Sequence, residues 1–88
     1  MSHEQKVKDG DAAQRLMSDK ALLSAFELIE SDCLQSFSKL KHNEVEKMVE
    51  INMQIKSLAL LKDKLEHVIT TGKVSETMLE KLKNKVTQ

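Results

Sequence analysis

The sequence predicts an all-α fold: an antiparallel helical hairpin with a short third C-terminal helix, coiled-coil-like packing and assembly into an oligomeric bundle. Its 88 residues include no Pro, two Gly and two aromatic residues, which favours helix over sheet. Apolar residues recur at alternating steps of three and four, and capping signals mark where helices begin. Because so short a chain buries little surface, oligomerisation is the expected support.

The N-terminal part divides into a tail and the start of a domain. Residues 1–10 contain one buriable aliphatic side chain among charges of both signs, so we expect a flexible tail there. A single helical domain is expected over 11–88. Asp11 and Gln14 have the spacing of a capping box, which predicts a short helix over about 12–16.

The first long helix is expected over about 19–41. Ser18 precedes an acidic residue and has the chemistry of an N-cap. Cys33 lies in the apolar row, where a small buried hydrophobe is the economical interpretation of a lone cysteine. The predicted inner face is Leu22, Phe26, Ile29, Cys33, Ser36 and Leu40.

A second, longer helix is expected over about 44–71, and it organises the rest of the chain. Asn43 and Glu46 form a capping signature, and the short break before them forces the two long helices to lie antiparallel. Gly72 is expected to end the helix as a C-cap. The predicted seam is Met48, Ile51, Ile55, Leu58, Lys62, Leu65 and Ile69.

Lys62 is the one polar member of this seam. A lysine there can fix register or oligomeric state. The alternative, which we favour, is that its stem lies on the seam while its ammonium reaches out to Glu66 or to a partner carboxylate.

Two sets of apolar residues lie outside the predicted hairpin core and are available to bind partners. Val49, Met53 and Leu60 fall together on the face opposite the seam, where a simple hairpin would show water only polar groups. A last helix over about 75–86 has a thin apolar face and needs another surface to hold it. The predicted partner-binding residues are therefore Val49, Met53, Leu60, Met78 and Leu82.

No motif indicates an enzyme. The sequence has no HExxH, CxxC, GxGxxG or glycine-rich phosphate loop, and Asp63 with His67 offers two metal ligands without a third. We therefore expect no catalytic, cofactor-binding or metal site and no small-molecule substrate. The longest apolar run, Leu58 to Leu61, is far too short to span a bilayer, so the expectation is a soluble intracellular protein without a membrane partner.

Nucleic acid is a second candidate partner, less favoured than protein. Fourteen basic residues cancel fourteen acidic ones, so attraction to DNA would need a local patch. A solvated face is the default interpretation of the lysines near the C-terminal end. The candidate contacts there are Lys73, Lys81, Lys83 and Lys85.

Three stretches resemble small helical proteins of tailed bacteriophages: 19–26 (DKALLSAF), the charged break at 42–47, and 65–73 (LEHVITTGK). The resemblance implies a virion or genome-packaging accessory protein that acts by assembly, in the host cytoplasm or the virion. The first expectation is thus a homo-oligomeric protein that also contacts another protein. The alternatives are a DNA-binding oligomer like a small terminase and a helical inhibitor of a host protein.

Overall fold

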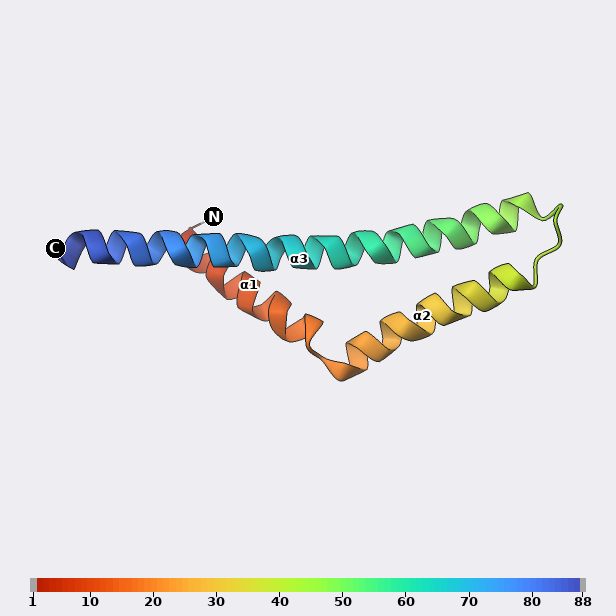
Figure 1. The fold of residues 1–88 in the computed structure, drawn as a ribbon, viewed down its shortest axis with the longest axis horizontal. Coiled ribbons are helices and arrows are strands. Elements are labelled where there is room, and N and C mark those ends of the chain that lie inside the picture. The colour runs from red at the N-terminus through yellow and green to blue at the C-terminus, as the bar shows by residue number, and fades with distance from the viewer. Residues whose placement is uncertain (1, 88) are drawn as a thin grey trace. The chain divides into compact units, whose positions relative to one another are not determined.

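The computed structural model describes the backbone of residues 2–87 and the side chains of residues 2–85. Over that range it has three helices and no strand: α1 (His3–Met17), α2 (Lys20–Ser38) and α3 (Val45–Thr87) (Figure 1). The prediction of an all-α fold is confirmed. Two units can be distinguished. The terminal unit contains α1 and the part of α3 from Asp63 onward, and the central unit is Asp19–Lys62.

Helix α1 corrects the expected N-terminal tail. Residues 3–10, assigned to a tail, and the short helix expected over 12–16 form one helix from His3 to Met17. Its N-cap is Ser2, whose Oγ accepts a hydrogen bond from the backbone N–H of Gln5 at 3.1 Å. Ser2 and Gln5 have the capping-box spacing, so the signal was present before the first predicted cap.

Helix α2 begins one residue later than expected and ends three residues earlier. Asp19, rather than Ser18, is the N-cap, and its Oδ1 accepts from the backbone N–H of Leu22 at 2.9 Å. An ionised carboxylate accepts from a helix N-terminus more strongly than a hydroxyl does. Ser18 instead closes α1, where its Oγ donates to the carbonyl oxygen of Gln14 at 3.0 Å.

Glu44 organises the turn that leads into α3. One of its carboxylate oxygens accepts from the backbone N–H of Lys41 at 3.3 Å, and the other lies 3.0 Å from the ammonium of Lys47. The hydrogen bond from Lys47, followed by that from the Lys41 backbone, lowers the pKa of the Glu44 carboxyl below 4.5. The helix then starts at Val45.

Helix α3 corrects the expected break at Gly72. It runs without interruption from Val45 to Thr87, so the helices expected over 44–71 and 75–86 are one element (Figure 1). No glycine among the described residues has a positive φ, so Gly72 does not adopt the left-handed conformation of a C-cap. A glycine inside a helix costs roughly 1 kcal/mol relative to alanine, and packing has to offset that cost.

That packing is the contact of α1 with α3 in the terminal unit. A Cβ atom at Gly72 would lie 2.9 Å from the Gly10 Cα and 2.9 Å from the carbonyl oxygen of Lys6. Further along, His3 Nδ1 and Ser75 Oγ form a hydrogen bond of 3.0 Å. Because His3 meets Ser75, Lys6 meets Gly72 and Gly10 also meets the carbonyl oxygen of Val68, the two helices run antiparallel. Gly72 is therefore a point of close helix contact.

In the central unit, α2 packs against the first part of α3. Phe26 and Cys33 of α2 are buried, as are Ile51 and Leu58 of α3. Cys33 Sγ lies 3.6 Å from Gln54 Oε1, and Glu30 pairs with Lys62, so these helices also run antiparallel. The inner face predicted for the first long helix is buried only in part: Leu22 and Leu40, which lies beyond the end of α2, are half-buried, and Ile29 and Ser36 are exposed.

Candidate assembly surface

One edge of the contact between α2 and α3 is closed by Lys62. Its ammonium donates to Glu30 Oε1 at 2.6 Å and lies 5.3 Å from the centre of the Phe26 ring. The stem thus lies on the seam while the charge reaches outward, as favoured above, but the carboxylate it meets belongs to Glu30 and not Glu66. Surface ion pairs and cation–π contacts of this kind add little to the free energy of unfolding. Their main effect is to hold the two side chains in place.

The other edge of the same contact is open and mostly apolar. A hollow of about 460 Å³ is lined there by Ile29, Met53, Gln54, Ser57, Leu58 and Leu61. A second hollow shares Ile29 and Gln54 and adds Asp32, Cys33 and Ser36. We call these two adjoining hollows the groove. Among its lining residues only Asp32 carries a charge, so it has the composition of an interface core.

The predicted partner-binding residues are exposed in both units of the structure. Val49, Met53 and Leu60 are exposed on α3, and Met53, which is 62% exposed, is the one that lines the groove. Met78 and Leu82 are exposed on the part of α3 that belongs to the terminal unit. That these five residues bind a partner stays a prediction.

Other exposed apolar side chains escaped the sequence analysis. Ile29 was assigned to the core, yet its side chain is 44% exposed and lines the groove. Leu61 is 50% exposed and lines the groove as well. Leu28 and Leu34 also point to solvent from α2. For Leu28 and Leu34, the position off the predicted inner face was the available signal, since a helix in a simple hairpin needs only one apolar stripe.

The candidate nucleic-acid contacts do not form a stripe. Lys73, Lys81, Lys83 and Lys85 are all exposed on α3. At 3.6 residues per turn they spread over about 200° of the helix circumference, and Glu76 and Glu80 lie within that arc. The arrangement is that of a mixed-charge helix surface.

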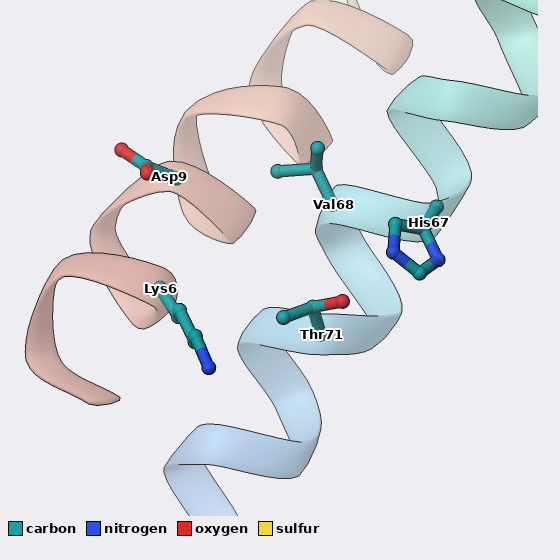
Figure 2. A pocket seen from close by; sticks show the side chains of 5 residues that line it. All are labelled: Lys6, Asp9, His67, Val68 and Thr71. Atoms are coloured by element: carbon teal, nitrogen blue, oxygen red, sulfur yellow. The ribbon is translucent and has the colours of Figure 1, made fainter. Parts of the chain in front are cut away.

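A small pocket of about 170 Å³ lies in the terminal unit between α1 and α3 (Figure 2). Val68 points toward α1, whereas the carboxylate of Asp9 points away from α3 and accepts from Gln5 Nε2 at 2.8 Å. Lys6, His67 and Thr71 complete the lining. With Asp9 held on its own helix, the pocket contains no acid–base pair arranged to act together.

The remaining candidates for chemistry are separated from one another. Cys33 is buried at 4% exposure, and its Sγ donates to the Oε1 atom of Gln54 at 3.6 Å. Within the described residues, no three His, Cys, Asp or Glu side chains converge on a point where a metal ion could be held.

No protein-family model, curated protein or solved structure matches this chain. Among the described residues, no helix combines the length and the apolar character needed to cross a bilayer.

Proposed function

We propose that this protein is a non-enzymatic helical assembly protein, which binds further copies of itself and presents the assembly to another protein. The resemblance to small phage proteins suggests a virion or packaging accessory role for such an assembly. The observation that carries the proposal is the excess of exposed over buried apolar side chains.

The described side chains include five buried apolar residues and fourteen large apolar residues that are exposed. None of the large side chains is fully buried. A chain with so small a core is marginally stable alone, and association with another copy is a common way to cover the remainder.

Sedimentation velocity of Met53→Glu tests the proposal. Met53 is 62% exposed, so a charge there leaves the subunit core intact but becomes costly once another chain covers it. We expect slower sedimentation with unchanged helicity by circular dichroism. Lys56→Glu is the matched control, because it places the same charge on an exposed position one turn away. Equal sedimentation of wild type and both variants would contradict the proposal.

A DNA-binding assay separates the DNA-binding alternative. Binding to plain duplex DNA that disappears at moderate salt, and that is lost when Lys81, Lys83 and Lys85 become Gln, would favour that alternative over protein assembly.

A further inference from the structure

We propose that the groove side of α3 binds the same surface of a second copy, in antiparallel orientation, about a two-fold axis beside Ser57. This inference rests on the proposed assembly function and specifies its interface.

The first support is the difference between the two edges of the contact between α2 and α3. One edge is closed by Lys62, which bonds Glu30 and covers the Phe26 ring. The other edge is hollow, with Met53 and Leu61 both at least half exposed. Nothing in the central unit covers these apolar side chains, whereas a second helix laid along the groove would.

The second support is the register of α3, which is complementary to itself. Glu50, Ser57 and Lys64 are seven residues apart and lie on one helix face, with Met53 and Leu61 beside Ser57. In an antiparallel pair centred on Ser57, Met53 of each copy meets Leu61 of the other.

The same register pairs Glu50 of each copy with Lys64 of the other, on both sides of the axis. Both side chains are exposed, and among the described residues neither forms an ion pair within the chain. A parallel pair of α3 helices would instead place Glu50 against Glu50 and Lys64 against Lys64. Repulsion between these like charges disfavours the parallel pair. Charge complementarity therefore selects a second copy and its direction.

The third support is the bundle that results. Within one chain α2 and α3 are antiparallel, and the proposed contact adds an antiparallel neighbour to α3. Neighbouring helices with opposed dipoles and short connections are typical of four-helix bundles.

A cysteine at the proposed axis gives the most direct test. Ser57→Cys in a Cys33→Ala background should form a disulfide with its own counterpart under mild oxidation, because residues on a two-fold axis come within the ~7 Å Cα separation that a disulfide requires. Lys56→Cys in the same background is the control, since it is exposed one residue away and faces about 100° from position 57. Non-reducing electrophoresis and intact mass report the product.

Charge exchange tests the register without touching the core. Glu50→Lys and Lys64→Glu should each weaken dimerisation about tenfold, since each turns two attractive pairs into repulsive ones. The double variant should return to within about threefold of wild type.

The outcomes distinguish this interface from the general proposal. If the wild-type protein is monomeric at every concentration, both the proposed assembly function and this interface are contradicted. If wild type is oligomeric but position 57 links no faster than position 56 and charge exchange does not restore dimerisation, this interface is overturned and assembly through another surface stands. Selective linkage at position 57 together with charge rescue supports the interface.

Discussion

Gly72 lies inside a helix because of the backbone it faces. A Cβ atom there would come within 2.9 Å of both the Gly10 Cα and the Lys6 carbonyl oxygen. Helix propensity alone predicts that Gly72→Ala stabilises by about 1 kcal/mol. The contact predicts the opposite sign, because the α1 and α3 backbones must separate, and a net loss of about 1–2 kcal/mol is expected.

Thermal or urea unfolding followed by circular dichroism measures whether Gly72→Ala raises or lowers the free energy of unfolding. Lys73→Ala is the control, because it changes an exposed neighbour on the same helix and should shift stability by no more than about 0.5 kcal/mol. A Gly72→Ala protein more stable than wild type would show that α1 does not pack on Gly72.

Glu44 gives a prediction about pH. The bond from the Lys47 ammonium lowers the pKa of its carboxyl from 4.5, so the ionised form is favoured in the folded state. This contribution to stability is fully present above pH 4.5 and is lost as the pH falls through the lower folded pKa. NMR titration should place the Glu44 midpoint below 4.5, and Lys47→Gln should move it upward. No movement in that variant would remove Lys47 as the cause.

At the scale of elements, the sequence predicted what periodicity and composition determine. The seam of α3 is borne out at Ile51 and Leu58, which are buried, because a three-and-four spacing forces those side chains onto one face. Termini were predicted less well. Asp19 took the cap assigned to Ser18, since neighbouring residues compete for the same donors.

The uninterrupted course of α3 and the docking of α1 could not be read from local signals. Gly72 resembles a C-cap in sequence, and only the close approach of Gly10, 62 positions away in the chain, explains why it remains helical. The groove was likewise hidden, because whether Ile29 is core or surface depends on how α2 packs on α3.

The ion pair between Lys62 of α3 and Glu30 of α2 predicts a measurable coupling energy between the two side chains. The two side chains are 32% and 47% exposed, so solvent screens the pair and a coupling energy of only about 0.5 kcal/mol is expected. A double-mutant cycle with Lys62→Ala and Glu30→Ala measures it. Lys62→Met keeps the stem over Phe26 and should cost less than Lys62→Ala. Additive effects of the two alanine variants would show that the pair does not couple the helices.

The molecule as a whole combines a small buried core with many exposed apolar side chains. The chain has enough apolar side chains for more contacts than its own helices make, and the groove is where the central unit leaves them open. The lysines near the C-terminal end of α3 are interspersed with Glu76 and Glu80 around the helix. The proposed function therefore depends on association between chains.

The molar mass of the wild-type protein tests that claim most directly. Light scattering after size exclusion, over a range of concentrations and with and without duplex DNA, should give a multiple of 10.0 kDa in the absence of DNA. A mass of 10.0 kDa at every concentration, with or without DNA, would contradict the account.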